Sequence, residues 1–243
     1  MKKYVLETPE QLGQSAAKQT ADLINAAIAA NGTARIVMST GASQFDTISN
    51  LRNADIDWSK VEMFHLDEYI GVPATHPASF VKYLRERFIG DDIPIKHAHY
   101  IDGMADPAQV IADITREIRK APIDVALIGI GENAHIAFND PPADFDTKEA
   151  FIIVDLDEAC KAQQVREGWF PNLDAVPKKA ITMTVYEIMQ AKVIISAVPY
   201  SQKAQAVKST VENDVTNLIP ATILKTHKDW SLYIDKASAS LLK

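Results

Sequence analysis

An apolar run from Ile123 to Ile130, interrupted only by Asp124, is the feature that most constrains the fold. Such a run is typical of a parallel strand buried on both faces, and Gly129 and Gly131 at its end indicate a tight loop. Ligands bind at the carboxyl ends of strands in open α/β sheets, so we predict that this loop is functional. An ordinary strand-to-helix turn with a solvated histidine is the alternative that this segment alone leaves open. The loop concentrates five polar side chains: Glu132, Asn133, His135, Asn139 and Asp140.

Strand-like and helix-like segments alternate along the rest of the chain. Short apolar runs predict strands at 34–39, 61–66, 151–154, 180–185, 192–198 and 230–234, with a further short one around 97–99. Helical spacing predicts helices at 8–30, 80–88, 107–119, 156–165 and 186–190, and after residues 43 and 203. This alternation predicts an α/β fold with a mostly parallel, doubly wound sheet covered by helices on both faces, of the Rossmann-like kind. We find no linker or repeat and expect a single domain over 1–243.

Composition narrows the class of partner. Hydrophobic residues make up 47% of the 243, enough for a large core, and the net charge of −7 argues against nucleic acid as the main partner. Cys160 is the only cysteine, so no intrachain disulfide can form, and we expect no cysteine-based metal site. His97 and His99 alternate without an obvious third ligand and are a weak metal signal. With neither a secretory signal nor a membrane span, we expect a soluble, cytoplasmic protein.

Three further segments carry chemistry at strand ends or helix starts. Residues 40–43 (T-G-A-S) lie between a strand and a helix, where backbone N–H groups can bind an anion. The glycine spacing fits neither a Walker loop nor a dinucleotide fingerprint, and a generic turn is the alternative. Asp67 and Glu68 follow the strand at 61–66, and at most one of them is expected to face a site. Lys203 lies in the first turn of a helix, which suggests a bound anion, although an exposed lysine is the commoner case.

Four segments, taken in order, resemble the glucosamine-6-phosphate deaminase/isomerase family, whose superfamily also contains the 6-phosphogluconolactonases. They read S-T-G-A-S at 39–43, L-D-E-Y at 66–69, G-I-G-E-N-A-H-I-A-F-N-D-P at 129–141 and S-Q-K-A at 201–204. The similarity runs from about residue 34 to residue 234. It implies conversion of a hexosamine 6-phosphate and water into fructose 6-phosphate and ammonia, with a small-molecule substrate and no metal, nucleotide or organic cofactor.

The resemblance also assigns roles to residues. It gives the phosphate to Thr40, Gly41, Ala42, Ser43 and Lys203. It makes Asp67 the base that moves a proton between C2 and C1, with Glu68 beside it at the substrate. It makes His135 the ring-opening histidine, which suits an unperturbed imidazole pKa of about 6.5.

This chain departs from the family at three places. Asn133 stands where an aspartate is usual, Ala134 replaces a glycine, and Asp140 replaces a glutamate that orients the histidine. We nevertheless predict that Asn133 and Asp140 belong to the catalytic set. Arg166 is a candidate for the second phosphate-binding cation, since the family has an arginine ahead of two phenylalanines and the segment here reads R-E-G-W-F.

Several alternatives stay open at this point. The I-A-F-N run and the acidic residue before Pro141 favour a deaminase over a lactonase. Because Asn133 and Asp140 differ from the usual family residues, galactosamine 6-phosphate is an alternative substrate. Hydrolysis of a sugar-phosphate lactone is the alternative reaction. A non-catalytic sugar-phosphate sensor is the alternative from another class. The resemblance leaves the oligomeric state open, a homo-oligomer included.

Overall fold

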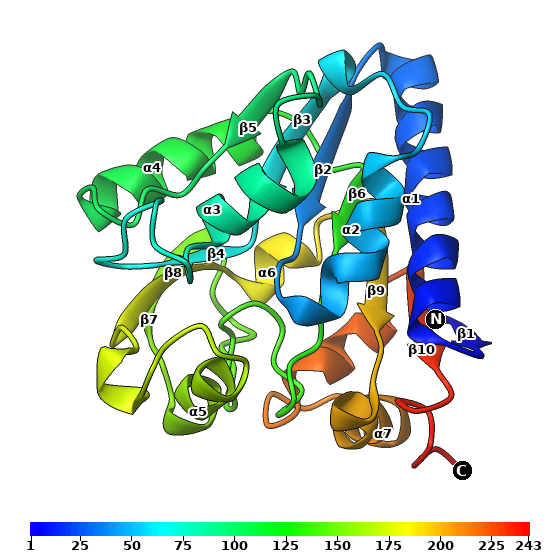
Figure 1. The fold of residues 1–243 in the computed structure, drawn as a ribbon, viewed down its shortest axis with the longest axis vertical. Coiled ribbons are helices and arrows are strands. Elements are labelled where there is room, and N and C mark those ends of the chain that lie inside the picture. Colours follow the sequence, from blue (N-terminus) through cyan, green and yellow to red (C-terminus); the bar gives the residue numbers. More distant parts are fainter.

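Seven parallel strands form the main sheet of the computed structural model, which describes the backbone of residues 1–243 and every side chain except that of Ala159 (Figure 1). The strand order is β1-β10-β9-β6-β2-β3-β5. The strands are β1 (Lys2–Leu6), β2 (Ala34–Met38), β3 (Val61–His65), β5 (His97–His99), β6 (Val125–Leu127), β9 (Val193–Val198) and β10 (Trp230–Asp235). The mostly parallel sheet expected from the sequence is confirmed. Of these seven strands only β1 was not predicted, because its exposed, lysine-rich sequence lacks the apolar run that marks the inner strands.

Helices cover both faces of this sheet, as predicted. Neighbouring residues of a strand point to opposite faces, so Ile36 packs in one core cluster and Val37 in the other. The cluster with Ile36 includes α1 (Pro9–Asn31), α2 (Phe45–Arg52) and α3 (Phe80–Leu84), which a π-helical turn at Arg85–Ile89 continues. The cluster with Val37 includes α4 (Pro107–Ile118), α6 (Val185–Ile188) and α7 (Ala204–Glu212). Short 3-10 turns lie at Ala42–Gln44, Trp58–Lys60, Leu173–Ala175, Ser201–Lys203 and Pro220–Thr226.

A second, three-stranded sheet was not predicted from the sequence. It consists of β4 (Asp67–Tyr69), β8 (Lys179–Met183) and β7 (Phe151–Asp155), paired antiparallel in the order β4-β8-β7. Apolar runs predicted β7 and β8 as strands, but they do not reveal which strand each one pairs with. Along β7, burial falls off at alternate positions, as is typical of a strand with one open face. Figure 1 shows β7 and β8 beside the main sheet, next to α5 (Glu158–Arg166).

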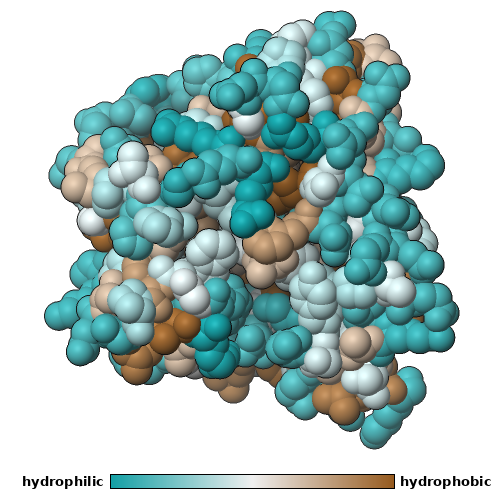
Figure 2. All heavy atoms as spheres, in the orientation of Figure 1, coloured by the Kyte–Doolittle hydropathy of each residue, from teal (hydrophilic) through white to brown (hydrophobic). Residues whose placement is uncertain are grey.

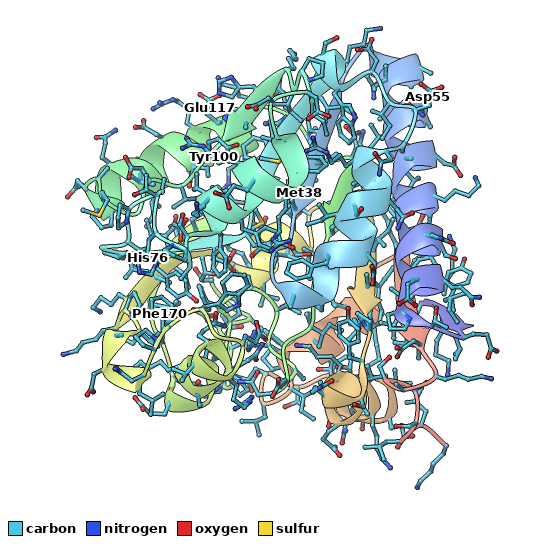
Figure 3. The ribbon with its side chains drawn as sticks, viewed as in Figure 1. Met38, Asp55, His76, Tyr100, Glu117 and Phe170 are labelled. Atoms are coloured by element: carbon cyan, nitrogen blue, oxygen red, sulfur yellow. The ribbon has the colours of Figure 1, made fainter. Side chains whose placement is uncertain are left out.

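The second sheet and α5 share a third, smaller apolar cluster. It is separate from the two clusters of the main sheet and is rich in aromatic rings. Tyr69 lies 5.3 Å from Phe138 and 5.4 Å from Phe170, measured between ring centroids. His76 stacks on the same Phe170 at 5.5 Å, and Figure 3 shows these two side chains over this part of the molecule. This cluster joins the second sheet to α5, whereas Phe151, Ile181 and Met183 of the same sheet pack in the cluster that contains Val37.

The surface and helix lengths complete this description. Figure 2 shows a face covered mostly by hydrophilic side chains, with apolar ones visible near its middle. Among the described residues, none of the helices combines the length and the apolar character that a membrane crossing needs.

The first helix begins and ends as its sequence predicts, but one glycine inside it has a packing role. Thr8 caps the helix by accepting a hydrogen bond from the Gln11 N–H at 3.3 Å, and Gly32 ends it with a left-handed φ of +78°. Gly13 lies where α1 meets α2. A Cβ atom at Gly13 would lie 2.5 Å from the Cβ of Asp46 and 2.9 Å from the backbone nitrogen of Thr47. Only glycine lets the two helices approach this closely.

We therefore expect Gly13→Ala to destabilise the protein, although alanine is the better helix former. The propensity gain of about 1 kcal/mol is smaller than the cost of pushing two helices apart, about 1–3 kcal/mol. Thermal denaturation measures the result, and Gln14→Ala at the exposed neighbouring position is the matched control. A Gly13→Ala variant as stable as Gln14→Ala would contradict the close approach.

Candidate active site

A pocket lies at the carboxyl ends of the central strands of the main sheet. The chain adds β3 and β5 on one side of β2, then returns to place β6 on the other side, so the strand order reverses between β2 and β6. Loops that diverge at such a reversal leave a crevice, which is the usual ligand site of open α/β sheets. The pocket is lined by Ser39–Ser43, Leu66, Asp67, Phe80, Gly129–Gly131, His135, Ala137, Phe138, Gln163, Gln164, Glu167, Trp169 and Lys203.

The loop after β2 has the backbone shape of an anion-binding turn. Gly41 has φ +101° and ψ 166°, a region open essentially only to glycine, and Ala42–Gln44 form a single 3-10 turn that leads into α2. The Tyr83 hydroxyl donates to the Gly41 carbonyl at 2.9 Å and fixes the loop from outside. The Ser39 hydroxyl oxygen is buried, lines the pocket and has no hydrogen-bond partner among the described residues. A ligand oxygen in the pocket would meet this hydroxyl and the free end of α2.

Lys203 provides a cation in the same wall. It is only 7% exposed, at the end of the 3-10 turn that precedes α7, and no described carboxylate lies within ion-pair distance of its Nζ. Burial lowers the pKa of this lysine, and the carboxylates of Glu167 and Glu132 partly oppose that effect. A buried cation without a counterion is stabilised when an anion binds beside it.

Asp67 and Glu68 point to different places, as neighbours on an extended strand should. Asp67 is 7% exposed and lines the pocket. Burial, followed by the carboxylates of Glu68 and Asp140, raises its pKa well above the usual range. Its carboxyl group therefore takes up a proton more readily than an exposed one.

Glu68 does not line the pocket, which corrects its place among the predicted substrate-binding residues. Its carboxylate accepts hydrogen bonds from the Tyr69 N–H at 2.9 Å, the Ser79 hydroxyl at 2.7 Å and the Val81 N–H at 3.0 Å. These contacts join β4 to the start of α3. Glu68 is thus a structural carboxylate that holds the strand carrying Asp67.

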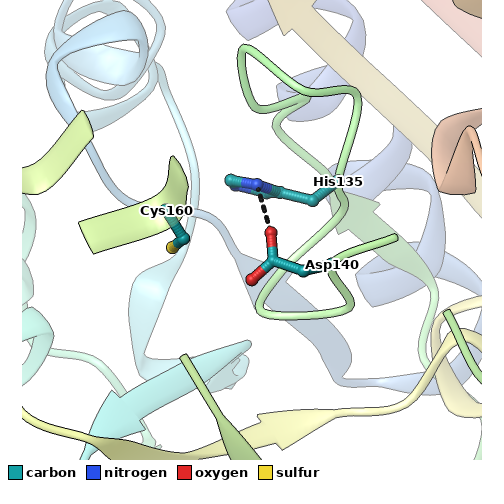
Figure 4. A group of neighbouring side chains, drawn as sticks. All are labelled: His135, Asp140 and Cys160. Atoms are coloured by element: carbon teal, nitrogen blue, oxygen red, sulfur yellow. Dashed lines mark ion pairs between the residues drawn. The ribbon is translucent and has the colours of Figure 1, made fainter. Parts of the chain in front are cut away.

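The imidazole of His135 faces the pocket and lies against Gly131, where a Cβ would be 2.2 Å from its Nε2. Its Nδ1 is 3.0 Å from Oδ1 of Asp140, an ion-pair contact drawn in Figure 4. Asn133 donates from Nδ2 to the same Oδ1 at 3.0 Å, and its own Oδ1 accepts from the His135 backbone N–H. Burial alone would raise the pKa of Asp140, but the contacts with His135 and Asn133 outweigh it and lower that pKa.

Asn133 and Asp140 do not line the pocket, but both contact His135. The shorter Asp140 side chain does reach the imidazole. Ala134, at the position where the resemblance leads us to expect glycine, has a left-handed φ of +63°. That conformation costs a residue with a Cβ about 1–2 kcal/mol, which explains why glycine suits the position.

The structure does not bring Arg166 to the pocket. Its guanidinium pairs with Glu132, and its side chain is 57% exposed. The two residues line a neighbouring hollow, which also contacts Lys203 and Ser43. The pairing supplies Arg166 with a counterion, and its contact with phosphate stays a prediction.

One wall of the pocket was not predicted from the sequence. The end of α5 and the following turn provide Gln163, Gln164, Glu167 and Trp169. The Tyr69 hydroxyl donates to the Gln164 side-chain oxygen at 2.8 Å, which ties this wall to β4. The sequence signal for this wall was a pair of adjacent glutamines in a helix that lacks an apolar face. In the structure both glutamines are buried, and buried polar side chains usually have partners.

These groups suit acid–base chemistry on a small anion: a free cation, a carboxyl that holds a proton readily, and an imidazole backed by a carboxylate. Comparison with known proteins narrows that class. The family model described as glucosamine-6-phosphate isomerases/6-phosphogluconolactonase matches residues 7–232. The chain therefore belongs to this family. It is an enzyme, and its α/β fold is the one that the sequence predicts.

Similar proteins agree with this placement. A glucosamine-6-phosphate deaminase of Lactobacillus helveticus (strain DPC 4571) is 36% identical over 215 residues, 87% of each chain. A second, of Thermoanaerobacter sp. (strain X514), is 34% identical over 232 residues, 93% of this chain and 90% of the relative. A solved structure described as a monomeric glucosamine-6-phosphate deaminase has a TM-score of 0.89 at 30% identity and covers 99% of this chain and 100% of its own.

The lactonase branch shares the fold. A putative 6-phosphogluconolactonase from Neisseria gonorrhoeae FA 1090 has a TM-score of 0.78 at 19% identity and covers 97% of this chain and 99% of its own. This likeness concerns the arrangement of the sheet and helices alone.

The raised pKa of Asp67 has a consequence for stability. Unfolded aspartates ionise near pH 4, so above that pH the unfolded chain has lost this proton while the folded state still holds it. The free energy of unfolding therefore falls as the pH rises towards the folded-state pKa.

We expect Asp67→Asn to stabilise the protein at neutral pH, and the gain over the wild type to disappear below about pH 4. Urea denaturation at a series of pH values measures this, with Asp91→Asn at an exposed position as the control. A gain that does not change with pH would show that Asp67 ionises normally in the folded protein.

Proposed function

We propose that this enzyme converts glucosamine 6-phosphate and water into fructose 6-phosphate and ammonia. The observation that carries the proposal is the meeting, in one pocket, of an anion-binding loop, a free lysine, a buried aspartate and a carboxylate-backed histidine. The relatives at 33–36% identity support it, since they are named glucosamine-6-phosphate deaminases.

The phosphate group is bound first, and the loop from Thr40 to Ser43 together with Lys203 holds it. Backbone N–H groups and a lysine are suited to a dianion, and the Ser39 hydroxyl adds a donor at the buried end. Anchoring the phosphate places the sugar carbons along the pocket towards Asp67 and His135. Such positioning removes much of the entropic cost of the later proton transfers.

His135 opens the sugar ring. The bond between C1 and the ring oxygen breaks as the ring oxygen gains a proton and the C1 hydroxyl loses one, which leaves an aldehyde. His135 exchanges these protons, while Asp140 holds the ring and stabilises its charged form. Asn133 fixes Asp140 through Oδ1 and so supports the same orientation.

Asp67 then moves a proton between two carbons. Its carboxylate takes the proton from C2, and the electron pair left behind forms a C1–C2 double bond. The C1=O double bond opens at the same time, and its oxygen becomes a hydroxyl with a proton given up by the ammonium group of the substrate. Return of the proton to C1 leaves an iminium at C2. Water adds to that carbon, ammonia leaves, and the C2 ketone of fructose 6-phosphate remains. Burial raises the pKa of Asp67, so its carboxylate accepts the C2 proton more readily than an exposed one would.

The remaining sequence-based alternatives differ in substrate or reaction. Galactosamine 6-phosphate differs only in the hydroxyl at C4, and the same residues would handle it. A lactonase would use His135 to activate water and would not need a base at C2, so the buried Asp67 favours the deaminase. A homo-oligomer and a cytoplasmic location remain predictions, and the relative of known structure is described as monomeric.

The reaction itself is tested by supplying the purified protein with glucosamine 6-phosphate and measuring ammonia and fructose 6-phosphate in equal amounts. Galactosamine 6-phosphate and a gluconolactone phosphate are assayed in parallel. Binding of a hexosamine 6-phosphate without ammonia release from either amino sugar would favour the sensor, and fast lactone hydrolysis would favour the lactonase.

Asp67→Asn is expected to lower kcat by about 100- to 10,000-fold, the usual contribution of a general base. Binding of a phosphate-containing competitor should stay within a few-fold of the wild type, because the phosphate contacts are untouched. Steady-state kinetics and calorimetric binding measure the two effects. Near-normal turnover by this variant would exclude Asp67 as the base.

Lys203→Ala is expected to raise KM about 10- to 100-fold with a smaller change in kcat, as for loss of a charged contact made in both ground and transition states. Lys208→Ala is the matched control, because Lys208 lies on α7, the helix that follows the turn of Lys203, and is paired with Glu212. A lowered kcat at unchanged KM would refute the role of Lys203 in phosphate binding.

A further inference from the structure

Behind the pocket, three side chains from two segments form a cluster of potential metal ligands. They are His135, Asp140 and Cys160, shown in Figure 4, and one donor atom of each lies within 4.8 Å of those of the other two. His135 and Asp140 come from the loop after β6, and Cys160 comes from α5. The cysteine lies 25 positions after the histidine, and this separation hid the grouping in the sequence.

The cluster contains buried atoms that lack partners. His135 Nδ1 and Asp140 Oδ2 have no hydrogen-bond partner among the described residues. The contact of 3.0 Å between Nδ1 and Asp140 Oδ1 has the length of an ion pair without the alignment of a hydrogen bond. The Asp140 side chain is only 10% exposed, and Cys160 is 1% exposed. Buried polar atoms are almost always satisfied, so these two call for an explanation.

We propose that His135, Asp140 and Cys160 form an inhibitory zinc site. An imidazole nitrogen, a carboxylate oxygen and a thiolate sulfur are the three ligand types of protein zinc, at about 2.0–2.3 Å from the ion. In a tetrahedral site these lengths place ligand atoms about 3–4 Å apart, so small side-chain rotations close the cluster around an ion. Water or a substrate oxygen from the pocket completes the fourth position.

Charge favours a divalent cation here. Zinc binds the thiolate form of a cysteine, so binding releases the thiol proton, after which the ion neutralises both the thiolate and Asp140. Affinity consequently rises with pH, and each ion bound releases about one proton from the thiol.

Zinc in this position would stop the proposed reaction. His135 faces the pocket, which gives the ion a route to the cluster, whereas Cys160 closes the inner side. A metal on Nδ1 separates His135 from Asp140, so the imidazole no longer exchanges protons with the sugar. The inhibition rests on the proposed function, but binding of the ion does not.

Cobalt absorption of the metal-free protein tests the binding directly. Cobalt(II) occupies zinc sites, and a thiolate ligand gives it a strong ultraviolet charge-transfer band. Cys160 is the only cysteine, so in the wild-type protein this band reports Cys160 alone, whether or not the variants fold. We expect one equivalent of cobalt, the thiolate band, and displacement by one equivalent of zinc. Binding without the band, or no binding at millimolar cobalt, would overturn the proposal.

Variants identify the other two ligands. Asp140→Asn should weaken zinc binding at least about tenfold, and Cys160→Ala should abolish the cobalt band. His97→Ala is the matched control. The rings of His97 and His99 on β5 lie 4.2 Å apart, measured between centroids, but these two residues belong to no group of three potential ligands among the described residues. A cobalt band that persists unchanged in Asp140→Asn would exclude that carboxylate as a ligand.

Inhibition is then measured as the ratio of rates with and without zinc in each variant. We expect a large ratio for the wild type and for His97→Ala, and a ratio near one for Cys160→Ala. A protein that shows the cobalt band but no turnover of any sugar phosphate would leave the zinc site standing and refute the proposed reaction. Equal zinc inhibition of wild type and Cys160→Ala would refute inhibition through this site.

Discussion

The pairing of β6 between β2 and β9 is the constraint on which the rest of the structure depends. Val125 and Ala126 pair with Ile36 and Val37 on one side, and residues 125–127 pair with 193–195 on the other. These few residues bring together loops that are more than 150 residues apart in the chain, the loop of Gly41 and the turn of Lys203. Because β6 is buried on both faces, polar side chains are disfavoured along it. This short strand is therefore recognisable in the sequence as part of an apolar run.

Local chemistry was predictable, and distant pairing was not. Helix α1 was predicted almost to the residue because Thr8, Pro9 and Gly32 are close-range signals. The apolar run ending at Gly129 located the central loop, and the family resemblance singled out His135 within it. The second sheet was missed because nothing within Asp67–Tyr69 reveals that it pairs antiparallel with Lys179–Met183. The wall of Gln163 and Gln164 was missed for the same reason, since it reaches the pocket only through tertiary packing.

The site also shows how an extended backbone gives two neighbouring carboxyl groups different environments. Asp67 and Glu68 are neighbours, both are buried, and burial raises the pKa of both. Glu68 is surrounded by three donors and holds β4 to α3, whereas Asp67 faces the pocket without that support. The carboxylate of Glu68 therefore holds in place the strand that carries Asp67. The protein keeps Asp67 in a position that costs stability, as is usual where a side chain must exchange protons.

The aromatic cluster around Tyr69 and Phe170 has a consequence for how the wall of the pocket is held. It joins β4, which carries Asp67, to the turn after α5, which carries Glu167 and Trp169 at the pocket. The other face of the second sheet packs on the main sheet, because Phe151, Ile181 and Met183 belong to the core cluster that contains Val37. The wall is therefore fixed to the main sheet through two successive layers of apolar packing, with the second sheet between them.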